Sequence, residues 1–207
     1  MRTSCISLLC CCLIGAAAAE TPLFDGKTFA GWEGDIAKTW RVEDGALVAG
    51  DLNVKFPRNE FLATVKTYKN FVLRLEYKIE GTEGFVNSGV QIRSVRIDKP
   101  AHEMSGYQAD IGKDWSGSLY DESRRNKVLA KADPAVVDKA EKLSEWNRYE
   151  IRCEGPRIIL RINGTQTVDY TEAEATIPLD GHIALQIHGD GKTIVRFRNL
   201  TIDQLPD

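Results

Sequence analysis

Short runs in which apolar and polar side chains alternate make up most of this chain, and they determine its fold class. From Phe71 to Ile79, every second residue is Phe, Leu, Leu, Tyr or Ile, with Val, Arg, Glu and Lys between them. A period of two is typical of an antiparallel strand that buries one face. The pattern therefore predicts an all-β protein.

Turn-forming residues separate these runs and predict hairpins. The expected hairpins join residues 40–42 to 46–48, 146–153 to 157–162, 157–162 to 165–170, and 182–188 to 193–202. Their turns contain Asp44-Gly45, Gly155-Pro156, Asn163-Gly164 and Gly189-Asp190-Gly191. Many short strands at this spacing indicate a sandwich or jelly roll of antiparallel sheets.

One short helix is expected in an insertion near residues 133–143. Asp133 can cap it, and Pro134 suits the first helical position. No repeat, low-complexity tract or linker divides residues 20–207, so we interpret them as a single domain.

Residues 1–19 have the features of a cleaved signal peptide. Arg2 precedes an apolar run, and Ala17-Ala18-Ala19 fits the small residues of a cleavage site. The run is too short for a transmembrane segment, and no other run is long enough. The alternative is a lipoprotein, but Leu9 and Cys10 stand where a lipobox has small residues. We therefore expect an exported protein, periplasmic or extracellular, without a lipid anchor.

Cysteine content and net charge limit the disulfides and the partners that the domain can have. Four of the five cysteines lie within residues 1–19, so the domain keeps only Cys153 and no internal disulfide. Cys153 lies in an alternating strand, which favours a buried thiol over a nucleophile. The net charge of −3 and the absence of a Lys/Arg cluster argue against a nucleic-acid partner.

Three predicted strands carry apolar residues on one side and ligand-recognising groups on the other. The polar groups that share a face are Asn87, Gln91 and Arg93, then Gln108 and Asp110, then Gln186 and His188. If the three strands are neighbours, these groups form one polar wall. A merely solvated face is the alternative, but such a face usually carries Lys, Glu and Thr.

Residues 106–126 are the richest in such groups, and their second half has no hydrophobic period. That half contributes Trp115, Tyr120, Asp121, Glu122, Arg124 and Arg125. Groups of this kind hydrogen-bond hydroxyls and stack on sugar rings, so we expect a carbohydrate site. We expect Tyr120–Arg125 to form a loop over its rim. Each carboxylate could instead pair with Arg124 or Arg125.

His188 is the best candidate for a general base, because histidine exchanges protons near neutral pH. Asp110, Asp121 and Glu122 are the candidate acids. Paired carboxylates suit ordinary glycoside hydrolysis, but the Glu-x-Asp-x-x-Glu motif of laminarinase-type jelly rolls is absent. The sequence specifies no cofactor. A divalent metal such as Ca²⁺ is compatible with it, although no residue set defines a site.

Several short motifs follow one another in a fixed order. They are residues 23–27 (LFDGK) with Gly31-Trp32, 40–45 (WRVEDG), 87–93 (NSGVQIR), 106–108 (GYQ), 117–120 (GSLY), Trp146-Asn147, Asn163-Gly164 and 181–188 (GHIALQIH). Each is weak alone, but the ordered series resembles the 3-keto-disaccharide hydrolase domain family, formerly a domain of unknown function. The resemblance spans nearly all of residues 22–205.

The resemblance implies a concanavalin A-like jelly roll and activity on glycosides oxidised to a ketone at C3. The ketone acidifies the C2 proton, a base removes it, the C1 substituent leaves by β-elimination, and water adds back. On this hypothesis His188 or Asp110 is the base, and Arg93 or Arg124 stabilises the enolate. The residues expected to bind substrate are Asn87, Gln91, Gln108, Trp115, Tyr120, Asp121, Glu122, Arg124, Arg125 and Gln186.

One departure from the family pattern bears on activity. The family commonly has Glu where this chain has Gln108, and an amide cannot transfer a proton. Asp110 could take over the acidic role, or the substrate could differ. Two alternatives to the keto-sugar enzyme remain: a non-catalytic carbohydrate-binding module and an ordinary two-carboxylate glycoside hydrolase.

Overall fold

The computed structural model describes residues 20–207, and the signal-peptide prediction lies outside them. Within this part of the chain, α1 spans Pro134–Ala140. The strands are β1 Thr21–Pro22, β2 Trp32–Glu33, β3 Trp40–Glu43, β4 Ala46–Gly50, β5 Glu60–Tyr68, β6 Phe71–Gly84, β7 Asn87–Arg96, β8 Met104–Gly112, β9 Leu119–Glu122, β10 Lys127–Ala130, β11 Asn147–Glu154, β12 Arg157–Ile162, β13 Thr165–Thr171, β14 Gly181–Ile187 and β15 Gly191–Gln204.

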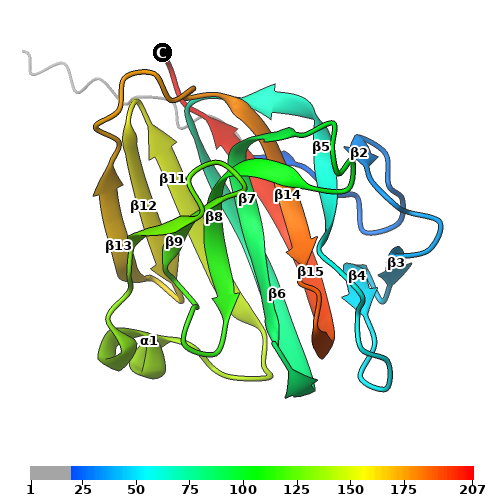
Figure 1. Ribbon diagram of the computed structural model, residues 1–207. Helices are drawn as coiled ribbons and strands as arrows, with labels where there is room; N and C mark the ends of the chain where they lie inside the picture. The colour runs from blue at the N-terminus through cyan, green and yellow to red at the C-terminus, as the bar shows by residue number, and fades with distance from the viewer. Residues whose placement is uncertain (1–19) are drawn as a thin grey trace, which may run out of the picture.

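Two antiparallel sheets pack face to face (Figure 1). The first sheet has the order β13-β12-β11-β6-β15-β4-β3, and β1 pairs with β15 beside it. The second sheet has the order β10-β9-β8-β7-β14-β5-β2. The expected two-sheet jelly-roll sandwich is confirmed, and so is the short helix, whose N-cap Asp133 accepts from the N–H of Ala135.

The alternating residues form the core between the sheets. Phe71, Leu73, Leu75 and Tyr77 of β6 are at most 2% exposed and face apolar residues of the second sheet. Cys153 is buried in the same core, and burial raises the pKa of its thiol to about 12. It is the buried thiol that the strand pattern predicts.

One expected hairpin is wrong. The pairs β3–β4, β11–β12 and β12–β13 form as predicted. However, β14 pairs with β5 and β7 in the second sheet, whereas β15 pairs with β4 and β6 in the first. The Gly189–Gly191 segment therefore carries the chain from one sheet to the other instead of closing a hairpin.

Candidate active site

The three polar strand faces lie side by side, because β8, β7 and β14 are neighbours in the second sheet. Their glutamines are buried at the centre of the outer face. Gln91 Nε2 donates to Gln108 Oε1 over 3.0 Å, and Gln108 Nε2 donates to Gln186 Oε1 over 3.2 Å. Ser94 Oγ donates to Gln91 Oε1. The predicted wall is thus one connected network of amides.

Gly89 makes this network possible. It lies on β7 between Asp110 of β8 and Gln186 of β14 in the strand register. A Cβ at this position would lie 2.7 Å from Cδ of Gln108. The missing side chain therefore leaves room for Gln108 to cross β7 and reach Gln186.

A cavity of about 160 Å³ opens at the end of this wall. It is lined by Phe85, Asn87, Gln108, Asp110, Trp115, Tyr120, Glu122 and His188. Phe85 is the one lining residue that was not among those expected from the sequence, although it lies two positions before Asn87. Its ring contacts the rings of His188 and Trp115 edge-on, with centroid distances of 4.6 and 6.3 Å. The cavity thus has an aromatic rim suited to a sugar ring.

Asp110 is the buried carboxyl of the cavity, at 2% exposure. Its Oδ1 accepts from Gln108 Nε2 over 2.9 Å, and its Oδ2 has no hydrogen-bond partner within residues 20–207. Burial, with a smaller contribution from the charge of Glu122, raises the pKa of Asp110 to about 8, and the Gln108 hydrogen bond opposes the shift. At neutral pH this carboxyl is therefore protonated and can donate a hydrogen bond to a ligand.

Glu122 is a second carboxyl on the same cavity. Burial raises its pKa to about 7, with a further contribution from the charge of Glu103. Gln186 Nε2 donates to Glu122 Oε2 over 3.5 Å, which opposes the shift. Glu122 therefore gains and loses a proton near neutral pH.

His188 is oriented as a base. Its Nδ1 lies 2.7 Å from the carbonyl oxygen of Gly189. Because a carbonyl oxygen can only accept, Nδ1 carries the proton and Nε2 keeps its lone pair. The ring is half-buried and lines the cavity. His188 thus offers one free basic nitrogen.

Arg93 does not reach the cavity, contrary to the parity argument. The β7–β8 register shifts between Ile92 and Val95, and Arg93 adopts φ +49° at this bulge. Its guanidinium donates to the carbonyls of Lys69 and Gly155 over 2.8 and 2.7 Å, and to Asn70 Oδ1 over 3.3 Å. The extra residue places Ser94, not Arg93, beside Gln91. Arg93 is a structural residue that ties the β5–β6 and β11–β12 turns to β7.

Arg93→Met is expected to lower the free energy of unfolding by about 3 kcal/mol, because it removes the three hydrogen bonds that the buried Arg93 guanidinium donates. Urea unfolding followed by tryptophan fluorescence measures this change. Arg41→Met is the control, since the Arg41 side chain is 44% exposed, and it should cost less than about 1 kcal/mol. Equal stability of the two variants would contradict this role of Arg93.

Asp121, Arg124 and Arg125 also lie away from the cavity. The expected loop at 120–122 is strand β9, whose alternation turns Tyr120 and Glu122 outward and Asp121 inward. Asp121 is fully buried and accepts from Arg124 Nε over 2.9 Å and from Arg125. Arg125 also binds Glu172 over 2.7 Å. The ion-pair alternative therefore holds for Asp121.

Residues 19–203 match a known protein family, which is described as "3-keto-alpha-glucoside-1,2-lyase-like domain". The chain belongs to this family. The resemblance read from the ordered motifs is thereby confirmed, and the chain is placed among carbohydrate-active, glycosyl hydrolase-like domains.

Relatives of this 3-keto-alpha-glucoside-1,2-lyase-like domain support that placement. A 3-keto-disaccharide hydrolase of Bacteroides thetaiotaomicron is 26% identical over 175 residues, which cover 72% of this chain and 57% of that protein. The chain thus spans little more than half the length of this curated relative. A candidate glycosyl hydrolase of Parabacteroides distasonis has a TM-score of 0.66 at 26% identity, covering 90% of this chain and 100% of that one. Carbohydrate-binding module CBM66 of Bacillus subtilis shares the fold alone, with a TM-score of 0.62 at 14% identity over 84% of this chain and 96% of that one.

The departure of this family member at Gln108 has a local reason. Gln108 accepts from Gln91 and donates to both Asp110 and Gln186. A carboxylate could not donate either of those hydrogen bonds, and it would add a negative charge beside Asp110. Gln108 therefore suits a site whose buried acid is Asp110.

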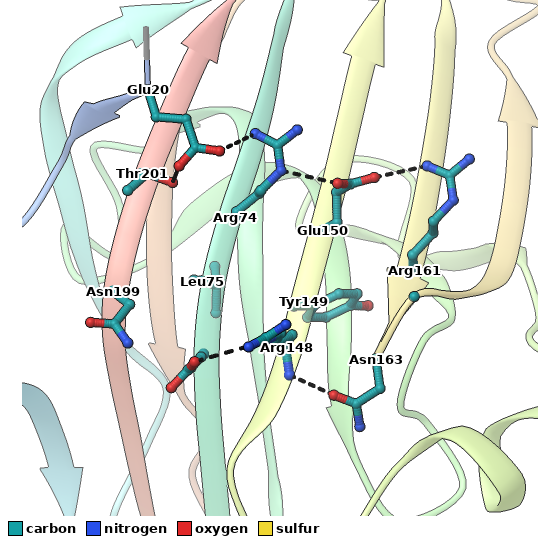
Figure 2. A pocket seen from close by; sticks show the side chains of 12 residues that line it. Glu20, Arg74, Leu75, Arg148, Tyr149, Glu150, Arg161, Asn163, Asn199 and Thr201 are labelled. Carbon is teal, nitrogen blue, oxygen red and sulfur yellow. Dashed lines mark hydrogen bonds and ion pairs between the residues drawn. The ribbon is translucent and has the colours of Figure 1, made fainter.

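A larger cavity of about 760 Å³ lies on the outer face of the first sheet (Figure 2). Its charged groups already neutralise one another. Arg74 binds Glu20 and Glu150 over 2.9 and 3.1 Å, and Glu150 binds Arg161 over 2.9 Å. This cavity therefore presents a paired surface network, whereas the smaller cavity has unpaired acid and base groups.

The described part of the domain has no cluster of three His, Cys, Asp or Glu side chains arranged to hold a metal ion. Within residues 20–207, no helix is long and apolar enough to cross a membrane.

Asp110→Asn is expected to stabilise the domain increasingly as pH rises. The folded domain keeps the Asp110 proton up to about pH 8, whereas the unfolded chain releases it near pKa 3.8. Stability is therefore lost through this window at about 1.4 kcal/mol per pH unit. The variant should exceed the wild type by about 2–4 kcal/mol at pH 8 and by little at pH 4, measured by urea unfolding. A difference that does not depend on pH would contradict the buried proton.

Proposed function

We propose that this domain cleaves glycosides whose C3 hydroxyl has been oxidised to a ketone, beginning with removal of the C2 proton. One observation carries the proposal: a base with a free nitrogen, His188, faces the same cavity as Asp110, a carboxyl that stays protonated at neutral pH. Elimination next to a ketone needs both a base and a hydrogen-bond donor for the enolate.

The steps assign one role to each group. Nε2 of His188 takes the C2 proton, and the electron pair of that bond moves to the C3 oxygen. Protonated Asp110 donates a hydrogen bond to the enolate oxygen, as a neutral carboxylic acid in an apolar site can. The ketone then re-forms, a C1–C2 double bond forms, and the C1–O bond breaks. Glu122 gives its proton to the leaving oxygen.

Addition of water completes the hydrolysis. Water attacks C1, Glu122 takes the proton that the water loses, and the imidazolium of His188, which exchanges its proton with solvent, returns a proton to C2. In this account Asp110 replaces Arg93 and Arg124 as the enolate stabiliser. Asn87 and Gln108 would bind sugar hydroxyls, and the Trp115 and Tyr120 rings would border the sugar.

The ordinary two-carboxylate glycosidase is the second candidate, because Asp110 and Glu122 share the cavity. That chemistry needs one carboxylate that is ionised in the resting enzyme. Burial raises the pKa of both carboxyls, to about 8 and about 7. At neutral pH Asp110 is therefore protonated and Glu122 is only partly ionised, which favours elimination over this alternative.

Turnover assays distinguish the candidates. Purified protein is incubated with methyl 3-keto-glucoside and with methyl glucoside, with and without a chelator, and released methanol is measured. We expect release from the keto substrate alone. Release from methyl glucoside would indicate an ordinary glycosidase. Sugar binding without any release would indicate a carbohydrate-binding module.

A further inference from the structure

A second cavity, of about 510 Å³, adjoins the candidate active site. It lies between the segment after β8, residues 112–118, and the insertion that contains α1. Figure 1 shows this loop and α1 at the same end of the sandwich. Trp115 lines both cavities, so the two adjoin at this ring.

At the end of the second sheet away from this cavity, residues 97–103 cover the outer face. The guanidinium of Arg96 donates to the carbonyls of Phe61 and His102, each over 3.3 Å, and holds residues 97–103 against the sheet. The outward side chains of Phe61 and Met104 are fully buried there. A substrate in the active-site cavity therefore cannot extend along the sheet toward that end.

The second cavity is lined by apolar side chains, including Val137 and Leu143, and by the polar side chains of Lys113, Asp114, Ser116, Ser118, Asp138 and Glu141. Val137 is half-buried, and Leu143 is 69% exposed although it is a large apolar residue. Glu141 Oε1 accepts from Tyr77 and from Ser116 over 2.6 and 2.8 Å, which leaves Oε2 for a ligand hydroxyl. The apolar side chains suit an aromatic ring, and the polar ones suit a hydroxyl group on that ring.

We propose that this second cavity binds the leaving group of the substrate, and that this group is an aromatic alcohol. Trp115 then separates the sugar, beside His188 and Asp110, from the aglycone between Val137 and Leu143. The natural substrates are accordingly 3-keto aryl glycosides. This inference rests on the proposed function and adds its substrate class.

The test uses a double variant, Val137→Ser with Leu143→Ser, on three 3-keto-glucosides. The substrates carry phenyl, methyl or a second sugar at C1. We expect kcat/KM to fall about tenfold for the phenyl glucoside and to stay within about twofold for the other two. Val136→Ser is the matched control, because Val136 is equally half-buried on α1 and lines neither cavity. It should leave all three values unchanged.

The outcomes separate this inference from the proposed function. An equal loss on all three substrates, a selective loss on the disaccharide, or no loss would overturn the aglycone assignment. Calorimetric titration with unoxidised phenyl glucoside supplies a readout without chemistry. A tenfold weaker affinity in the double variant would support the assignment even if no keto substrate were cleaved. Undetectable binding to the wild type, or equal affinity of the wild type and the double variant, would count against it even if keto substrates were cleaved.

Discussion

His188→Ala is expected to lower kcat/KM for a 3-keto-glucoside by about 10³-fold, within the range of general-base catalysis. His188 is the one residue with a basic nitrogen among those that line the cavity within residues 20–207. Its removal leaves the C2 proton without the imidazole nitrogen that is proposed to accept it. Initial rates at several substrate concentrations measure the loss, which should fall mainly on kcat rather than on KM.

His182→Ala is the control for this change. His182 also lies on β14 and is half-buried, and its Nδ1 lies 2.7 Å from the carbonyl oxygen of Thr64. It does not line the cavity, so its variant should keep nearly full activity. If His188→Ala retained more than about a tenth of the wild-type rate, the base would be another group, with Glu122 the first to examine.

The pH profile is expected to fall in two steps in the wild type, above about pH 7 as Glu122 ionises and above about pH 8 as Asp110 ionises. Only protonated Asp110 donates to the enolate oxygen. Asp110→Asn should lower kcat about 10²-fold and remove the step near pH 8 while keeping the step near pH 7, since its amide donates less well but does not titrate. Rates from pH 6 to pH 10 measure both effects.

Glu122→Gln separates the two carboxyls. This variant should be slower, because it cannot protonate the leaving oxygen, yet it should keep the alkaline decline set by Asp110. If the step near pH 8 disappeared in Glu122→Gln and persisted in Asp110→Asn, the roles assigned to the two carboxyls would have to be exchanged.

Strand alternation was sufficient to predict the polar wall but not its limits. The pattern in β7, β8 and β14 correctly placed Asn87, Gln108, Asp110 and His188 on one face. Counting by twos failed at Arg93, because a bulge shifts the register after Ile92. The residues that accommodate this bulge lie on the neighbouring strands.

Two glycines show why the bulge was not visible in the sequence of β7 itself. A Cβ on Gly106 would lie 2.2 Å from Ser94 Oγ, and a Cβ on Gly181 would lie 2.5 Å from the carbonyl carbon of Arg93. Both are required by contacts with a neighbouring strand, Gly106 from β8 and Gly181 from β14. The β14–β15 prediction failed for a related reason, since a glycine-rich turn connects adjacent strands and opposite sheets equally well.

The different surroundings of the two buried carboxyls could not be predicted from the sequence either. Nothing in the residues around Asp110 distinguishes it from Asp121, which is equally enclosed but neutralised by Arg124 and Arg125. The difference arises from the sandwich, which leaves Asp110 Oδ2 without a partner in the described chain and turns Asp121 toward two arginines.

The central claim is that cleavage begins at C2, and isotope incorporation tests it most directly. Methyl 3-keto-glucoside is incubated with the protein in D₂O, with the His188→Ala variant as the control for uncatalysed exchange, and the released sugar is examined by NMR. The account predicts methanol together with 3-keto-glucose that carries deuterium at C2. Methanol released with protium retained at C2 would contradict it.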